Sequence, residues 1–190
     1  MRTRLLFFLL ACLALLSVLL VYPAAGGGGK PLVTDIVITA AEGRLLLSAA
    51  VKDCFTEEML EGVHNGIPVT FRFKVHLERG RTYWFNQNIK EQGINHTLSY
   101  DPIRREYQIA FAEYDRPRTT RSRAEAQQMM AELRGIEIAT LKELQLGSSY
   151  TLRIKATLVE NTLPLSIHSL IPFYSIWNFE TDWRLVEFSY

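Results

Sequence analysis

Hydrophobic and polar residues alternate along most of the chain from about residue 32 onward. This period of two is the pattern of β-strands that bury one face. It is clearest at 69–78, where apolar residues occupy every second position from Val69 to Leu77. The stretch 150–160 repeats it. Further strands are expected at 32–39, 44–51, 94–101, 105–114 and 183–190, with 82–89 as a weaker candidate.

Two turns and two helices are expected between these strands. The sequence AAEG at 40–43 and DPIR at 101–104 predict hairpin turns, the second because proline presets φ. A first helix should begin at Thr56 and end near 65–66, with acidic residues in its first turn. A second should begin at Ser122, which forms a capping box with Glu125, and stop at Gly135. Its apolar stripe comprises Ala126, Met129, Met130 and Leu133.

These elements predict a mainly β protein. Seven or eight antiparallel strands with short connections favour an antiparallel β-sandwich, immunoglobulin-like in strand count, with two short helices. The alternative is an α+β fold with both helices on one face of an antiparallel sheet. Residues 32–190 are expected to form this single β-rich domain.

The first 31 residues are of a different kind. Two arginines precede an uncharged run from Leu5 to Val21, and small residues and four glycines follow. This layout predicts that 1–25 is a signal peptide or an uncleaved membrane anchor, with 26–31 as a glycine-rich linker. The run is long for a signal core and short for a bilayer span, so both alternatives stay open.

Charge and cysteine content exclude some classes of protein. Removing Arg2 and Arg4 from the formal net charge of +1 leaves −1 for the rest of the chain, so no nucleic-acid partner is expected. Cys12 lies in the apolar N-terminal run, which leaves Cys54 as the one cysteine of the domain. No disulfide can form within that domain, and Cys54 is expected to be a small buried apolar residue.

No sequence motif predicts catalysis. The four histidines lie far apart along the chain, and neither a G-x-S-x-G turn nor a glycine-rich phosphate loop is present outside the linker. We therefore expect no enzyme activity, no cofactor and no metal. The competing hypothesis, an enzyme or small-ligand binder with a pocket between the sheets, would gain support if a cleft brought together at least three of four residues: His76, His96, Glu180 and Asp182.

Two segments are candidates for contact with a partner. Four arginines fall within eight residues of one loop, where they would meet anionic lipid or an acidic protein surface, unless the loop is only a solvated connection. No charged residue lies between Glu160 and Glu180, and most of this apolar stretch must be covered by its own sheet, a membrane or a partner. The candidate contacts are Arg116, Arg118, Arg121 and Arg123 in the loop, and Ile171, Pro172, Phe173, Tyr174 and Trp177 in the apolar stretch.

Four motifs in order, DCFTEEM, GIPVTFRFKVHL, YDPIRREYQI and LPLSIHSLIPFYSIWNFETDW, resemble a bacterial family of exported proteins called the domain of unknown function four-three-nine-zero. The resemblance covers about 32–190. It implies a Gram-negative source and a location facing the periplasm, either secreted or tethered to the inner membrane. It also implies genes next to sensor histidine kinases of the nitrogen-regulation type, and it carries no activity or catalytic residues.

Together these observations predict an exported, non-enzymatic periplasmic domain that binds a protein in envelope signalling. The periplasmic domain of a sensor kinase is the expected partner, and the inner-membrane surface is a second expected contact. A lipid-binding component of the envelope is the remaining alternative.

Overall fold

The computed structural model of the 190-residue chain describes residues 29–81, 85–159 and 179–190. β-strands make up most of these residues, and helices are short. In chain order the elements are β1 (Leu32–Ala41), β2 (Arg44–Lys52), α2 (Glu57–His64), β3 (Val69–Arg79), β4 (Gln87–Asp101), β5 (Glu106–Phe111), β6 (Arg118–Thr120), α3 (Arg123–Ala131), β7 (Glu132–Thr140), the 3-10 turn η1 (Leu141–Glu143), β8 (Ser149–Val159) and β9 (Arg184–Ser189).

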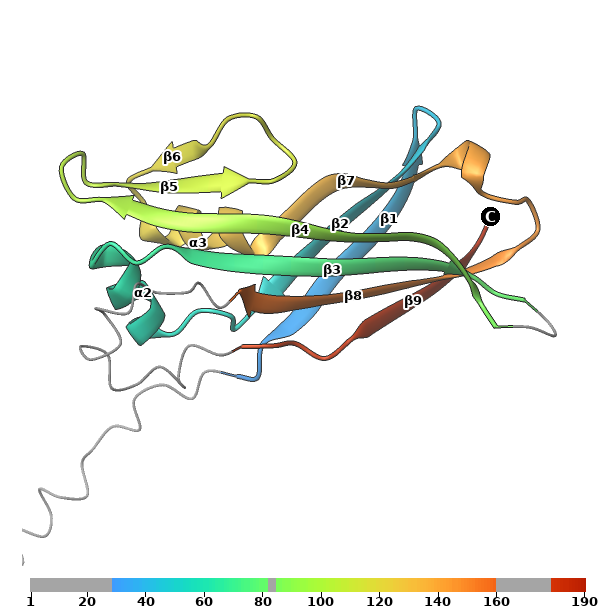
Figure 1. Ribbon diagram of the computed structural model, residues 1–190, viewed down its shortest axis with the longest axis horizontal. Helices are drawn as coiled ribbons and strands as arrows, with labels where there is room; N and C mark the ends of the chain where they lie inside the picture. The colour runs from blue at the N-terminus through green and yellow to red at the C-terminus, as the bar shows by residue number, and fades with distance from the viewer. Residues whose placement is uncertain (1–28, 82–84, 160–178) are drawn as a thin grey trace, which may run out of the picture.

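The strands form two antiparallel sheets. One has three strands in the order β1-β2-β7, and the other has six in the order β6-β5-β4-β3-β8-β9. Figure 1 shows the three-stranded sheet crossing behind the long strands β3, β4 and β8 at an angle, with α2 and α3 together at one end. The mainly β, sandwich-like fold predicted from the sequence is confirmed.

The core lies between the sheets because each strand buries the apolar half of its alternating pattern. Phe71 and Phe73 of β3 are fully buried, as are Leu47 of β2 and Ile138 of β7. Met130 of α3 is also fully buried, so this helix helps to close the open end of the sandwich. The outward positions of β3 and β8 carry polar and charged residues.

The first helix and the first hairpin follow local signals. The Thr56 side chain accepts a hydrogen bond from the Met59 amide, and α2 ends at His64 with Asn65 as its C-cap, as predicted. In the turn between β1 and β2, Glu42 and Gly43 have φ values of 51° and 74°. Two consecutive positive φ values are the geometry of a two-residue type I′ turn, which joins the strands tightly.

The second helix begins as predicted and ends earlier than predicted. Ser122 accepts a hydrogen bond from the Glu125 amide, but α3 stops at Ala131 and β7 starts at the next residue. The prediction that the helix ends at Gly135 was wrong: Gly135 has φ 62° within β7, where the pairing with β2 is irregular. Pairing of this segment with β2 outweighs the helical spacing of its apolar residues.

One predicted strand was too short, and one strand was not predicted. β4 is fifteen residues long and starts at Gln87, whereas the sequence predicts this strand over 94–101. β6, a three-residue strand at the edge of the six-stranded sheet, lies inside the arginine loop. The predicted strand at 82–89 overlaps residues 82–84, which lie outside the described residues.

The predicted signal or anchor at 1–25 also lies outside the described residues. Within 29–81, 85–159 and 179–190, no helix has the length and apolar character that crossing a membrane requires. That residues 1–25 are a signal peptide or a membrane anchor stays a prediction.

Cys54 is buried, as predicted, with its thiol 3.5 Å from the Val51 carbonyl oxygen. Burial raises the pKa of the Cys54 thiol from 9.0 to about 12. Since the thiolate is the reactive form, we expect Cys54 in a Cys12→Ser chain to react about 1000-fold more slowly at pH 8 than in the urea-unfolded chain. Ellman's reagent measures both rates, and equal rates would contradict the burial.

Candidate functional site

Basic side chains from two neighbouring strands lie together on the outward face of the six-stranded sheet. Alternation in β3 turns Arg72, Lys74 and His76 away from the core, and alternation in β8 does the same for Arg153 and Lys155. The pairing register sets Lys74 directly opposite Lys155 and His76 directly opposite Arg153. Two cross-strand pairs on adjacent rows thus bring basic groups together, an arrangement that costs stability when both members are charged.

Trp183 lies among these cations, just before β9. Its ring centroid is 4.9 Å from the Arg153 guanidinium carbon and 5.0 Å from the Lys155 ammonium nitrogen. The His76 ring meets it edge to face at 4.9 Å. Cations near an indole face are attracted by its quadrupole, so Trp183 offsets part of the repulsion and presents a half-buried aromatic surface.

The preceding residues hold Trp183 in place. Phe179 is buried and meets the Phe71 ring at 4.7 Å. Thr181 is also buried; its amide donates to the Ala156 carbonyl at 2.9 Å, and its hydroxyl accepts from the Ala156 amide at 3.0 Å. In the motif FETDW at 179–183, the buried Phe179 and Thr181 therefore hold the outward-facing Trp183 in position.

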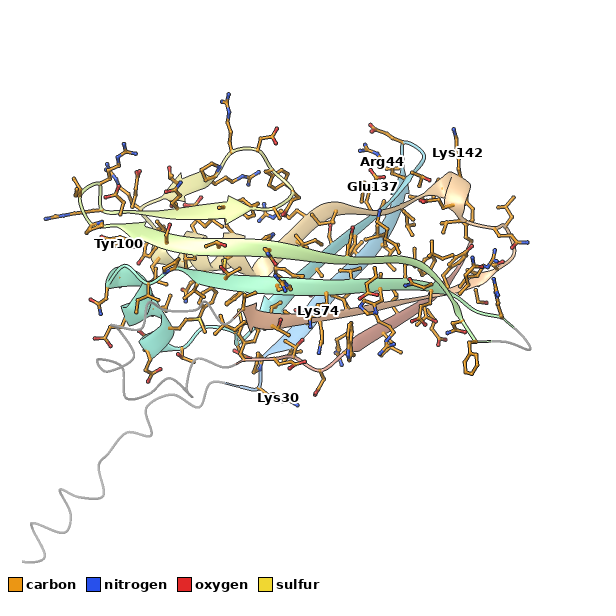
Figure 2. The ribbon with its side chains drawn as sticks, viewed as in Figure 1. Lys30, Arg44, Lys74, Tyr100, Glu137 and Lys142 are labelled. Atoms are coloured by element: carbon orange, nitrogen blue, oxygen red, sulfur yellow. The ribbon has the colours of Figure 1, made fainter. Side chains whose placement is uncertain are left out.

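Carboxylates at the rim of the cluster pair with some of its basic residues and leave others without a counter-charge. Glu91 lies 3.3 Å from His76. Glu180 accepts a hydrogen bond from Lys155, which is the main reason that the pKa of Glu180 is lowered below 4.5. Arg72 and Lys74 form no ion pair with any described residue, and Lys74 lies on the face turned to the viewer in Figure 2.

These side chains surround a shallow hollow of about 700 Å³, here called the outer groove. Gly93 of β4 lies opposite Lys74 in the register, so no side chain fills the floor there. An open, cationic surface with a fixed tryptophan is suited to binding an anionic ligand. Its lining residues are Arg72, Lys74, His76, Glu91, Gln92, Gly93, Asn95, Lys155 and Trp183.

The predicted arginine loop is divided among different contacts. Arg118 lies on β6, with its guanidinium carbon 5.5 Å from the Tyr114 ring centroid. Arg123 begins α3 and pairs with Glu57 of α2. Arg116 and Arg121 are exposed and pair with no carboxylate of the described residues. Partner contact by this loop stays a prediction.

The predicted contacts at Ile171, Pro172, Phe173, Tyr174 and Trp177 lie outside the described residues. Phe179, the last residue of the uncharged stretch, is described and is buried in the core. Contact of the 171–177 tip with a membrane or a partner therefore stays a prediction.

No three of the four ionisable residues that would mark a catalytic cleft converge in one cleft. His76 lies on the outer face, whereas His96 is fully buried between the sheets. Glu180 pairs with Lys155, and Asp182 pairs with Lys30 at 2.7 Å. Within the part of the chain that the structure describes, no three residues among His, Cys, Asp and Glu are grouped closely enough to hold a metal ion.

The basic residues of β3 and β8 were not singled out as a candidate site from the sequence, although alternation turns them outward. A signal was present, since FRFK at 71–74 and LRIK at 152–155 both place an arginine and a lysine between apolar residues. Only the register shows that the two sets meet.

The fold and this surface define a two-sheet antiparallel β domain with a basic, aromatic outer groove. The chain belongs to the family described as domain of unknown function DUF4390, whose model matches residues 30–187. Neither a curated protein nor a solved structure matches it.

The opposed lysines make a testable prediction about stability. Lys74→Thr is expected to raise the free energy of unfolding by about 0.2–1 kcal/mol, because it removes a like charge directly opposite Lys155. Urea unfolding at low salt measures the change, which should shrink at high salt. Lys90→Thr is the matched control, since Lys90 faces Leu77 in the register. An equal gain in both variants would contradict the charge repulsion.

Proposed function

We propose that this chain is an exported, non-enzymatic domain of the bacterial envelope that binds an acidic segment of a protein partner in the outer groove. The observation that carries the proposal is the cluster of five basic residues around Trp183, with Lys74 directly opposite Lys155. Arginine and tryptophan are also the residue types that most often dominate binding energy at protein interfaces.

Electrostatics supports an acidic partner. Lys74 and Arg72 lack a carboxylate within ion-pair distance among the described residues, although Glu78, Glu91 and Glu180 lie at the rim. Carboxylates of a partner would supply the missing counter-charges and relieve the repulsion between Lys74 and Lys155. Binding would thus recover stability that the free domain gives up.

The separation of the ionisable groups supports binding over catalysis. A general acid and a general base must both reach the same substrate atoms. Of the four residues that would mark a catalytic cleft, His96 lies inside the core and Asp182 is paired with Lys30. Only His76 and Glu180 therefore lie at the outer groove. The proposal therefore assigns the outer groove to recognition.

Export and the partner rest on the N-terminal segment and on what the family resemblance implies. The basic start, apolar run and small residues of 1–25 support secretion or a tether to the inner membrane. Genes next to sensor histidine kinases support a kinase's periplasmic domain as the partner. A β-lactamase fused after Tyr190 should protect Gram-negative cells from ampicillin only if the chain is exported, and sensitive cells would contradict export.

Binding of the neighbouring kinase's periplasmic domain to the full chain, in neutral detergent, tests the partner. Arg72→Glu with Lys74→Glu is expected to weaken binding at least about tenfold, because like charges would then face the acidic segment. Arg116→Glu with Arg121→Glu is the matched control with the same change in charge, and it should bind as the unmodified chain does. If only the control pair weakens binding, the arginine loop is the contact and the outer groove is not.

A further inference from the structure

We propose that the acidic segment binds as an added β-strand along the free edge of β4, with its outward carboxylates meeting Arg72. This inference rests on the proposed function and specifies how the outer groove holds its partner. It is carried by the pairing of β4, the direction of its backbone groups, and the position of Arg72 over Gly93.

The first half of β4 has a partner on one side only. β3 pairs with β4 along its length, from Arg79 opposite Gln87 to Val69 opposite Leu98. On its other side, β5 pairs only with residues from His96 to Asp101. Figure 1 shows β5 beside one half of β4 and not the other. Among the described strands, residues 87–94 therefore form an open sheet edge, which is a template for another strand.

Backbone groups of this edge point outward in a known order. The Asn95 carbonyl accepts a hydrogen bond from the Ala112 amide at 2.9 Å, so it points away from β3. In a strand the amide and carbonyl of one residue point to the same side, and the side alternates at each step. Gly93 and Glu91 therefore turn both groups toward the open edge.

Space is present next to this edge. A hollow of about 370 Å³ adjoins Gly93 on that side. It lies between the edge of β4, the turn after β5 and the start of β7, where the Gln92 side chain donates to the Glu137 carbonyl at 3.2 Å. Gln92 and Gly93 also line the outer groove, so the hollow and the groove meet across β4.

Arg72 extends across β4 toward the edge. A Cβ on Gly93 would lie 3.7 Å from Arg72 Cδ, so the arginine stem covers the position where other residues carry a side chain. Its Nε donates to Asn95 Oδ1 at 2.9 Å. An added strand would run about 4.8 Å beyond β4. Its outward Asp or Glu would meet the guanidinium, which binds carboxylates through two parallel hydrogen bonds.

A polypeptide fits this combination better than a phosphate or a lipid headgroup. The open edge presents hydrogen-bond donors (amides) and acceptors (carbonyls) in alternation. Only another polypeptide backbone has acceptors and donors in the matching order. The basic residues beside the edge then favour a segment with acidic outward side chains. The edge thus binds the backbone of the segment, and the outer groove binds its side chains.

The test uses a ten-residue peptide alternating Glu with Val and Thr, added to the full chain in neutral detergent. Its affinity is measured by fluorescence anisotropy and the amide exchange of Glu91 and Gly93 by NMR. We expect micromolar binding, protection of these two amides, and about tenfold weaker binding when alternate peptide amides are N-methylated. Arg72→Gln should weaken binding by a similar factor, and Arg116→Gln, the control, should not.

Two negative outcomes are distinguishable. If the peptide binds and requires Arg72 and Lys74, but N-methylation and amide exchange show no effect, strand addition is overturned and the proposed groove function stands. If the peptide does not bind, or binds equally after Arg72→Glu with Lys74→Glu, both proposals are overturned. Binding to vesicles of anionic lipid with no binding of the peptide would also overturn both in favour of a lipid ligand.

Discussion

His96→Leu is expected to lower the free energy of unfolding by about 2–6 kcal/mol, because it leaves two hydrogen-bonding groups without their partner, at about 1–3 kcal/mol each. His96 is fully buried, and its Nε2 lies 2.8 Å from Oε1 of Glu113. Its Nδ1 lies 3.0 Å from the Met130 carbonyl, which can only accept, so Nδ1 carries a hydrogen and donates. The substitution would leave that carbonyl and the Glu113 carboxyl without their partner.

The double variant separates the pair from the packing around it. Rings of Phe73 and Phe111 contact His96 at 5.0 Å and 4.7 Å, so leucine also changes apolar packing. His96→Leu with Glu113→Leu should recover part of the loss, because apolar replacements of both members leave no unsatisfied polar group at their contact. Urea unfolding followed by circular dichroism measures all variants. Losses that simply add would show that the pair contributes nothing as a pair.

Phe71→Ala is the second large effect, with an expected loss of about 3–5 kcal/mol from a fully buried aromatic residue. Phe71 lies near the start of β3 and contacts the rings of Phe55 at 5.0 Å and Phe179 at 4.7 Å. The cavity would therefore loosen the anchor that precedes Trp183 as well as the core. Acrylamide quenching of Trp183, in a chain with Trp84 and Trp177 replaced by Phe, should increase.

Phe85→Ala is the matched control for this prediction. Phe85 is 96% exposed, so the same truncation should change the free energy of unfolding by no more than about 0.5 kcal/mol. A comparable loss in both variants would mean that burial does not explain the effect of Phe71.

The residues that these stability predictions concern and the residues of the proposed binding site lie on opposite faces of the same strands. Phe71 and His96 face each other in the register on the inner side of β3 and β4, and Arg72 and Asn95 face each other on the outer side. The inner side holds the sheets together, whereas the outer side carries charge that this packing does not need. Core variants should therefore lower stability, and groove variants should change binding with small effects on stability.

Part of the candidate site could be predicted from the sequence. The last of the four family motifs ends with Phe179, Glu180, Thr181, Asp182 and Trp183, and the structure explains this order as two buried residues that hold a half-buried tryptophan. The basic residues of β3 and β8 were predicted to be outward-facing. Their convergence was missed because the separation of about 80 residues between the strands carries no information about register.

The error at the end of the second helix has the same origin. Met130 and Leu133 are spaced as on a helix, and Gly135 resembles a helix stop. In the structure Met130 belongs to α3 and Leu133 to β7, where it is buried against the core. Pairing of β7 with β2 outweighs the local preference, since a third strand buries apolar surface along its length.

The sequence by itself determined the alternating strands, both helix starts, the first hairpin turn and the burial of Cys54. These depend on residues within a few positions of each other, where period, capping and turn geometry act directly. The tertiary structure decided which strands pair and in which register, and so placed Lys74 against Lys155, Arg72 over Gly93 and one edge of β4 in the open. Those contacts join distant segments, and the packing of the whole sandwich selects them.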